Sequence, residues 1–302
     1  MNYCHAFHAG NFADVVKHAI LVRVLVHLRA KPALFRVLDT HAGAGLYDLA
    51  GPQASRGAEW REGIARLIAA SAQGQARTLL APYLDAVAAL NAPDQLTLYP
   101  GSPMLARAFL RQTDRLLACE LEPRAASALA GNLRGDPRCK AIAIDGWTAL
   151  HAYVPPKERR GLILIDPSFE DAAEFRHLEH ALVAAHRKWA TGIYLLWYPI
   201  KDRHSPDVLA RGLRTSGIAN ILRAEIDVAV PRDRLHACGL VLVNPPWKLE
   251  SEIKLLLPAL VAALTKGNGG SHRLDWLARE KLLAAQRHSF PGGAVRELKG
   301  VL

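Results

Sequence analysis

The stretch ILRAEIDVAVPRDRLHACGLVLVN (221–244) decides the fold of this 302-residue chain. It contains two apolar runs rich in branched residues, 221–230 and 238–244, which we expect to be strands. Only PRDRLHA and its edges separate them. A crossover between parallel strands needs about a dozen residues or more. This pair of strands must therefore be antiparallel.

Other short apolar runs precede this pair: FRVLD (35–39), RLLAC (115–119), KAIAI (140–144), GLILI (161–165) and GIYLLW (192–197). Runs without polar alternation are typical of strands that are buried on both faces of a sheet. Helical patterns lie between them, with shared faces formed by Ala13, Val16, Ile20 and Val24 and by Phe175, Leu178, Leu182 and Ala185. The spacing predicts a doubly wound α/β sheet with six parallel strands and a reversed, antiparallel last strand, seven in all. This is the Rossmann-like sheet of class I methyltransferases.

Residues 48–100 interrupt this alternation, and their apolar residues follow helical spacing (Trp60, Ile64, Leu67, Ile68; Leu80, Leu84, Val87, Leu90). We predict a small helical insertion subdomain there. Residues 1–47 and 101–277 would form the methyltransferase domain, and 278–302 a basic C-terminal tail. The stretch from 273 onward is expected to be part helix and part loose. Ser102-Pro103 predicts a helix N-cap followed by a first-turn proline.

The composition and net charge of the chain limit the classes of protein to which it can belong. The net charge of +10 and the pI near 9.7 favour a polyanionic partner, nucleic acid first. The four scattered cysteines form no CxxC pair, which favours reduced thiols in a cytosol. The start of the chain has no signal-peptide pattern, and the apolar run 19–28 is too short for a membrane span. We expect a soluble cytoplasmic protein without a membrane partner.

The histidines invite a metal interpretation, but the spacing of His5, His8, His18 and His41 matches no metal-ligand motif. No metal site is predicted.

Acidic residues end the first four predicted strands: Asp39, Glu120, Asp145 and Asp166. Ligands of doubly wound sheets lie outside the carboxyl ends of the parallel strands. Glu120 could accept both hydroxyls of a ribose, and Asp145, before Gly146, could accept from an adenine amino group. Each acid alone could equally be a solvated strand end. Together they favour S-adenosylmethionine as the cofactor.

The loop DTHAGAG (39–45) after the first strand lets backbone approach a nucleotide, although a tight turn explains it equally well. It lacks the third glycine of a dinucleotide site, which counts against a nicotinamide oxidoreductase.

Two tetrapeptides resemble the motif of enzymes that methylate exocyclic amines of bases: Asp166-Pro167-Ser168-Phe169 and Asn244-Pro245-Pro246-Trp247. The first ends a parallel strand and should lie at the ligand-binding rim. The second is the better match, but it ends the reversed strand and should lie at the opposite rim. We interpret it as a strand terminator in which Trp247 packs against the protein.

Asp166 has the chemical properties that methylation of an adenine amine requires. An adenine amine is a poor nucleophile because its lone pair is delocalised into the ring. The Asp166 carboxylate and the Pro167 carbonyl could accept its two N–H groups, and the carboxylate could take the proton. Phe169 would stack on the base, worth about 1–3 kcal/mol. The alternative is a helix-capping loop. WYPIKDRH (197–204) could line a base pocket or be a rim loop with buried aromatics.

Six stretches resemble the RlmJ family of 23S rRNA adenine-N6 methyltransferases over roughly residues 1–277: YCHAFHAGNFADVVKHAIL, LDTHAGAGLYDL, YPGSP, IDPSFE, TGIYLLWYP and VNPPWKLE. The resemblance implies S-adenosylmethionine as cofactor. It implies methylation at N6 of one adenine in naked or partly assembled 23S rRNA, by a monomer.

The resemblance also implies roles for individual residues. Tyr3 would contact the RNA, and Lys17 could meet a phosphate. Asp166 would be both cofactor ligand and proton acceptor. The other cofactor contacts would be His18, His41, Ser102, Glu120, Asp145 and Gly146. Ser168-Phe169 replaces the more usual Pro-Tyr, so a tyrosine hydroxyl cannot be required here.

Two other functions compete. A DNA adenine methyltransferase could use the same site on a flipped base, although no large target-recognition domain is evident. A non-catalytic rRNA-binding assembly factor would keep the basic surface without the chemistry.

Overall fold

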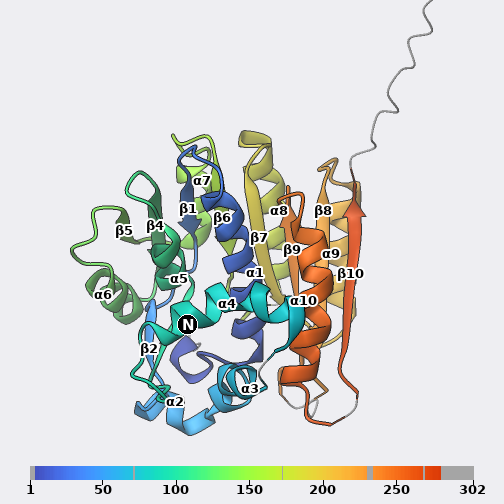
Figure 1. Cartoon of the computed structure of the whole chain (residues 1–302). Helices are drawn as coiled ribbons and strands as arrows, with labels where there is room; N and C mark the ends of the chain where they lie inside the picture. Colours follow the sequence, from blue (N-terminus) through green and yellow to red (C-terminus); the bar gives the residue numbers. More distant parts are fainter. Residues whose placement is uncertain (1–3, 71, 172, 230–233, 268, 280–302) are drawn as a thin grey trace, which may run out of the picture.

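The computed structural model describes all residues except 1–3, 71, 172, 230–233, 268 and 280–302 (Figure 1). Its main sheet has eight strands in the order β10-β8-β9-β7-β6-β1-β4-β5. Their bounds are β1 (Arg36–Asp39), β4 (Arg115–Glu120), β5 (Cys139–Ala143), β6 (Gly161–Ile165), β7 (Ile193–Pro199), β8 (Ile221–Asp227), β9 (Ala237–Val243) and β10 (Ser271–Ala278). A separate antiparallel pair joins β2 (Leu46–Asp48) to β3 (Leu98–Pro100).

The strand directions confirm the antiparallel pairing predicted for β8 and β9. β9 lies between β7 and β8 and is antiparallel to both, so β8 runs in the same direction as the parallel strands. The six strands predicted to run one way therefore do so.

The predicted count of seven strands was wrong, because β10 adds an eighth strand antiparallel to β8. This segment includes residues that we expected to belong to the domain end and a partly helical tail. Polar residues such as His272, Arg273 and Asp275 hide the strand in the sequence, since β10 is an edge strand with a largely exposed start. The rest of the predicted tail, 280–302, lies outside the described residues.

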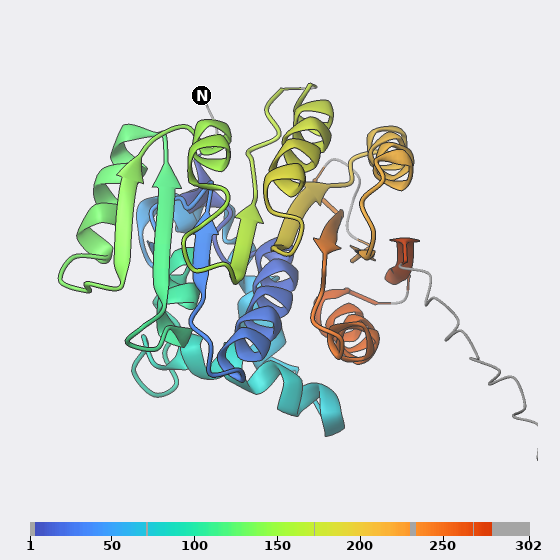
Figure 2. The ribbon, with the colours of Figure 1, turned by 90° about the horizontal axis from the view of Figure 1, so that it is seen from above.

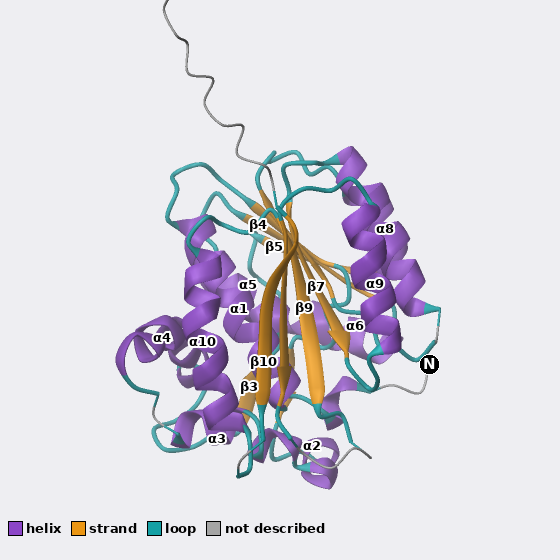
Figure 3. Ribbon diagram, turned by 90° about the vertical axis from the view of Figure 1, so that its right-hand side faces the viewer, coloured by secondary structure: helices purple, strands orange, loops and turns teal. Residues whose placement is uncertain are grey.

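Helices cover both faces of the sheet (Figures 2 and 3). α1 (Phe12–Arg29), α5 (Ser102–Phe109), α6 (Pro123–Asn132) and α10 (Leu249–Leu264) pack on one face, and α7 (Gly146–Tyr153), α8 (Glu174–Lys188) and α9 (His204–Thr215) on the other. Within β6, Leu162 and Leu164 join the first core while Ile163 and Ile165 join the second. Burial on both faces explains why the strands read as uninterrupted apolar runs. Of the helices described, none is both long and apolar enough to cross a membrane.

The stretch 48–100 holds the expected helices, α2 (Pro52–Gly57), α3 (Ile64–Ala69) and α4 (Gly74–Ala88), with the short 3-10 helix η2 (Glu59–Arg61). Figure 1 shows α2 and α3 at one end of the sheet. Ile64, Leu80 and Val87 are buried in the same core as α1. That residues 48–100 form a distinct subdomain stays a prediction.

The N-cap predicted for α5 was one residue too late. Gly101 is the N-cap and Ser102 the first helical residue. The Gly101 N–H donates to the Gly45 carbonyl at 2.7 Å, and a Cβ at position 101 would lie 3.1 Å from the same oxygen. Close approach of two backbone segments therefore places glycine at the cap.

The two tetrapeptides lie at opposite rims of the sheet, as predicted. Asp166 follows β6 at the carboxyl ends of the parallel strands. Asn244 follows β9, whose last residue, Val243, pairs with Tyr194 near the start of β7. The Asp166 tetrapeptide is thus the one at the rim where ligands of such folds bind.

Candidate active site

A cleft of about 1380 Å³ opens at the carboxyl ends of β1, β4, β5 and β6. Sites for one small ligand are commonly about 300–1,000 Å³, so the cleft has room for a nucleoside-sized cofactor and an extruded base together. Ten of the predicted site residues line it: Lys17, His18, His41, Ser102, Glu120, Asp145, Gly146, Asp166, Pro167 and Phe169. Tyr3 lies outside the described residues, although the next residues along the chain, Cys4 and His5, line the cleft.

Glu120 holds the glycine loop at one end of the cleft. Its carboxylate accepts from the backbone N–H of Gly43 and of Glu122, both at 2.8 Å. Gly43 and Gly45 have φ of 60° and 82°, which favours glycine at both positions. The loop after β1 is thereby fixed against the end of β4, where Glu120 lines the wall.

Gly146 brings α7 against the same loop. A Cβ at position 146 would lie 2.3 Å from the Thr40 carbonyl oxygen and 2.7 Å from the His41 ring, so only glycine fits. Asp145 is the N-cap of α7 and accepts from the Thr148 N–H at 2.7 Å. The adjacent acid and glycine therefore form a tight wall between β1 and β5.

An aromatic surface continues this wall. Burial lowers the pKa of His41 to about 4, so its imidazole is neutral near pH 7. The edge of the Trp147 ring meets His41 with 5.2 Å between centroids, and Trp147 stacks on His177 at 4.3 Å. All three residues line the cleft. An aromatic wall beside strand-end carboxylates suits an adenosine group.

Asp39 does not line the cleft, unlike the acids that end the next three predicted strands. Burial raises its pKa to about 7, against a weaker opposing interaction with the Ser102 hydroxyl. Within the described part of the chain, neither carboxylate oxygen of Asp39 has a well-formed hydrogen bond. The acid at the end of β1 thus lies behind the cleft wall.

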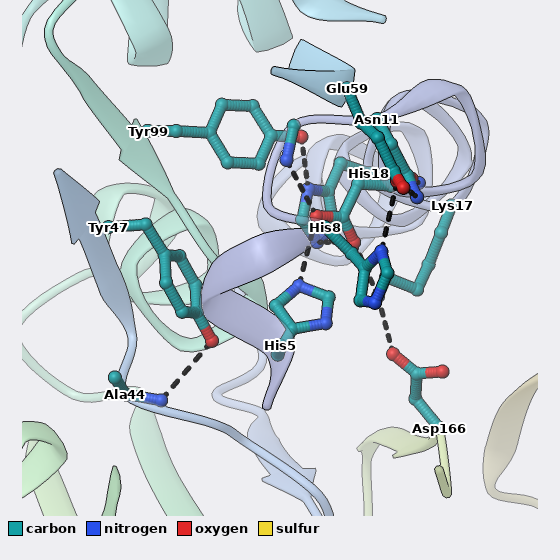
Figure 4. A network of polar contacts seen from close by, with 12 residues as sticks. His5, His8, Asn11, Lys17, His18, Ala44, Tyr47, Glu59, Tyr99 and Asp166 are labelled. Carbon is teal, nitrogen blue, oxygen red and sulfur yellow. Dashed lines mark hydrogen bonds and ion pairs between the residues drawn. The ribbon is translucent and has the colours of Figure 1, made fainter. Parts of the chain in front are cut away.

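Asp166 forms an ion pair with the buried Lys17 ammonium (Figure 4). Lys17 also lies 2.9 Å from Asp14, one turn earlier on α1. Burial alone would lower the pKa of Lys17, but the two neighbouring carboxylates raise it by more. The pKa of Lys17 therefore lies well above its ordinary value. Because the ammonium is buried between two carboxylates, the geometry gives no support to the phosphate contact predicted for Lys17.

Asp14 connects α1 to the N-terminal segment over the cleft. Besides the Lys17 ion pair, it accepts from the His5 imidazole at 3.0 Å and the Gly10 N–H at 2.9 Å. Burial opposes its ionisation, but His5 and Lys17 keep the pKa of Asp14 well below its usual value. The short 3-10 helix η1 (His5–Phe7) is held beside Asp166 in this way.

His18 links the site to the insertion. Its Nδ1 pairs with the Tyr99 hydroxyl at 2.7 Å, and Tyr99 pairs with the Tyr83 hydroxyl of α4 at 2.8 Å. Burial lowers the pKa of His18 to about 3, so the ring is neutral. Its Nε2 is buried and lacks a hydrogen-bond partner among the described residues. A polar ligand in the cleft could supply that partner, which fits the predicted cofactor contact.

Phe169 lines the cleft but is only 9 % exposed. Its ring packs against Phe175 at 4.9 Å and against Trp197 at 5.8 Å between centroids. Stacking on a base, as predicted for Phe169, would therefore use a small part of its surface. Trp197 also lines the cleft, which both interpretations of residues 197–204 allow, and the base pocket stays a prediction.

Several cleft residues were missed from the sequence: His5 as part of the site, Asp14, Tyr47, Trp147, His177 and Glu174. One signal was available for Asp14. It shares a turn of α1 with Lys17 and His18, and all three are buried in the first half of the helix, whose other residues are apolar. Buried titratable groups on one helix turn are candidates for a functional site.

A parallel sheet with β9 reversed, strand-end carboxylates around a large cleft and Asp-Pro after β6 together define a class I, S-adenosylmethionine-dependent methyltransferase. The family model described as "Ribosomal RNA large subunit methyltransferase D, RlmJ" matches residues 32–278. The chain belongs to this family.

Relatives support the assignment. The chain is 38 % identical over 282 residues to ribosomal RNA large subunit methyltransferase J of Escherichia coli K12, and 37 % identical over 283 residues to the protein of the same description from Haemophilus influenzae. Each alignment covers 93 % of this chain and 100 % of the relative. A crystal structure of a Legionella pneumophila protein is similar with a TM-score of 0.82 and 34 % identity, covering 89 % of this chain and 98 % of that one.

Proposed function

We propose that this protein transfers a methyl group from S-adenosylmethionine to the N6 amine of one adenine in 23S rRNA. The family and the relatives' descriptions support large-subunit rRNA as the substrate. The observation that carries the chemistry is the Asp166 carboxylate, which lines the cleft at the carboxyl end of β6 and is fixed there by Lys17.

Asp166 and Pro167 would orient the amine. Lys17 engages Oδ2 of Asp166, and the described residues give Oδ1 no hydrogen bond, so Oδ1 can accept one N–H of the adenine amine. The Pro167 carbonyl would accept the other N–H, which localises the nitrogen lone pair. Positioned proton acceptors of this kind contribute roughly 10²- to 10⁴-fold to a rate.

The cofactor, when bound, supplies an electron-poor methyl group on a sulfonium. As the adenine nitrogen takes the methyl group from the sulfonium it would become acidic, and the Asp166 carboxylate would accept its proton. Lys17 stays charged throughout, because Asp14 and Asp166 both hold its proton in place. Glu120, Asp145 and His41 would bind the adenosine part.

The proposal extends to the setting of the reaction. The protein would act in the cytoplasm as a monomer, on naked or partly assembled 23S rRNA. The net charge of +10 supports a nucleic-acid substrate. An adenine inside a base-paired stem would have to leave the stack to reach a cleft of this depth.

Transfer of labelled methyl groups tests this function directly. Unmodified 23S rRNA and duplex DNA are each incubated with the protein and labelled S-adenosylmethionine, and methylated nucleosides are mapped. We expect N6-methyladenosine at one position of the rRNA and no label on DNA. Label on DNA alone would establish a DNA methyltransferase. RNA binding without any label would indicate a non-catalytic assembly factor.

A further inference from the structure

Trp247, the last residue of the unused tetrapeptide, is 86 % exposed. The prediction that it packs against the protein was therefore wrong. The loop that carries Trp247 is nevertheless held in place by hydrogen bonds. The Asn244 side chain donates to the Ala190 and Gly192 carbonyls at 2.7 and 2.8 Å, and the Leu249 N–H donates to the Pro246 carbonyl. The loop thus presents a large aromatic ring to solvent from a fixed base.

A lysine side chain lies close to the Trp247 ring. The Lys248 ammonium lies 5.5 Å from the centre of the Trp247 ring. Directly after β10, Arg279 lies over Trp276 at 5.0 Å and contacts Glu250 of α10 at 3.5 Å. Exposed aromatic rings with adjacent cations are the means by which proteins bind unpaired nucleotides, by stacking on bases and pairing with phosphates.

The rest of this rim carries positive charge at its surface. It is the upper end of the sheet in Figure 1 and faces the viewer in Figure 2. The acids of its loops lie in internal ion pairs: Asp114 with Arg111 at 2.8 Å, Asp136 with Arg138 at 2.7 Å and Glu158 with Arg36 at 2.7 Å. Their side chains are at most 10 % exposed. Apart from Glu250, whose side chain is 38 % exposed and pairs with Arg279, the exposed charged residues of these loops and their edges are basic: Arg29, Lys31, Arg115, Arg134, Lys157, Arg159, Arg187, Lys188, Lys248 and Arg279.

The cleft rim has the opposite character. Nine acidic residues line the cleft, against four lysines and arginines: Asp14, Glu59, Glu62, Glu120, Glu122, Asp145, Asp166, Glu170 and Glu174 against Lys17, Arg124, Lys201 and Arg234. These carboxylates suit a cationic cofactor but repel phosphates. An RNA substrate therefore needs phosphate contacts elsewhere on the protein.

We propose that the rim opposite the cleft is a second RNA-binding surface, with a base stacked on Trp247 and phosphates on the surrounding lysines and arginines. This inference rests on the proposed function, since it assigns a second contact to the same rRNA substrate. Strands of five to seven residues separate the two rims by about 20 Å. The substrate must therefore extend well beyond the target adenine, and a hairpin shorter than the distance between the two rims cannot reach both surfaces.

The test compares two RNAs, a long unmodified 23S rRNA fragment and a short hairpin that contains the methylated adenine. Three variants change the rim: Trp247→Ala, Trp247→Tyr and the triple Lys31→Gln/Lys157→Gln/Lys248→Gln. Arg77→Gln, an exposed charge on α4 away from this rim, is the matched control. Dissociation constants are measured at several salt concentrations, and kcat is measured on the short hairpin.

We expect the triple variant to bind the long fragment at least about tenfold more weakly. The slope of log affinity against log salt should fall by about 2, since each phosphate contact contributes roughly 0.7–0.9. Trp247→Ala should also weaken the long fragment by about tenfold, while Trp247→Tyr and Arg77→Gln should bind as the wild type does. Binding and kcat for the short hairpin should not change in any variant.

Wild-type affinity of the triple variant and of Trp247→Ala for the long fragment would overturn the inference, as would an equal loss with the short hairpin. The proposed function fails separately, if the wild-type protein binds these RNAs but methylates neither of them. In that case the rim variants still decide whether this surface binds RNA.

Discussion

At the scale of single residues, the two carboxylates on either side of Lys17 have different surroundings. Asp14 is 2 % exposed and receives contacts from Lys17, His5 and the Gly10 N–H. The Asp166 side chain is 15 % exposed and lines the cleft. We therefore infer that Asp14 positions the groups around the reaction and that Asp166 is the carboxylate that would meet the substrate.

Replacing Asp14 by Asn tests the positioning role. The change removes the charge that holds Lys17 and His5, so the Lys17 ammonium would keep only Asp166 as its anionic partner. We expect kcat to fall by about 10²-fold and the free energy of unfolding to fall by about 3 kcal/mol, as for breaking a buried ion pair. Methyl-transfer kinetics and urea denaturation measure the two effects. Unchanged kcat in a folded Asp14→Asn protein would contradict the role.

Asp39 predicts a specific pH dependence of stability. Its pKa is about 7 in the folded protein and near 3.8 when unfolded, so between these values the folded state binds a proton that the unfolded state has released. The wild-type protein therefore loses stability at this site as the pH rises from about 4 to about 7. Asp39→Asn removes this loss. Its stability relative to wild type should rise by up to about 1.4 kcal/mol per pH unit across that range.

Urea denaturation of both proteins at several pH values measures this difference, and other titrating groups cancel in the comparison. A difference that stays constant with pH would show that Asp39 is ionised in the folded protein.

The sequence predicted the position of a single residue only where the end of a predicted strand determined it. Asp166 could be found because the end of an apolar run fixes the rim on which it lies. Its ion pair with Lys17 could not be found, because the two residues are 149 positions apart. The prediction for Trp247 was wrong for a related reason. A pair of prolines indicates where the chain leaves the sheet, but not the direction of the side chain that follows.

At the scale of elements, burial decided what the sequence could predict. Strands covered on both faces read as continuous apolar runs, and the short 221–244 connection determined the direction of β9. The edge strand β10 was missed because its polar residues serve in ion pairs. Arg223 of β8 is 1 % exposed, and Asp275 of β10 accepts two hydrogen bonds from it, each at 2.9 Å.

This pairing predicts that Asp275 holds β10 on the sheet. Asp275→Ala would leave the buried Arg223 guanidinium without its bidentate partner and should lower the free energy of unfolding by about 3 kcal/mol. Replacing both residues by Leu should cost much less, because the buried guanidinium is then absent and the buried Glu225 keeps Arg203 and Tyr198 as partners. Urea denaturation of the single and double variants measures the coupling. Equal destabilisation by both changes would show that the ion pair does not fasten the strand.

At the scale of the whole molecule, charge is divided between the two rims of the sheet. Among the charged residues that line the cleft most are carboxylates, and the opposite rim exposes lysines and arginines. The sequence supplied the total of +10 but not this division, since contacts such as the pairing of Glu158 with Arg36, 122 positions away in the chain, cannot be read from it.

RNA binding should therefore depend steeply on salt. With four to six phosphate contacts at about 0.7 each, affinity for single-stranded rRNA segments should fall roughly 50- to 300-fold between 50 and 200 mM salt. Fluorescence anisotropy measures this fall. Binding of S-adenosylmethionine, measured by calorimetry, is the comparison and should change little. Salt-independent RNA binding would contradict the proposed phosphate contacts.

The central claim is that catalysis belongs to Asp166 and not to the better-matching tetrapeptide at Asn244. The most direct measurement is the rate of N6-adenine methyl transfer to unmodified 23S rRNA by Asp166→Asn and by Asn244→Gly, which accommodates the φ of 52° at that position. We predict at least a 10²-fold loss of kcat for Asp166→Asn, with RNA binding retained, and near wild-type kcat for Asn244→Gly. Full activity of Asp166→Asn together with loss of activity in a folded Asn244→Gly protein would contradict the account.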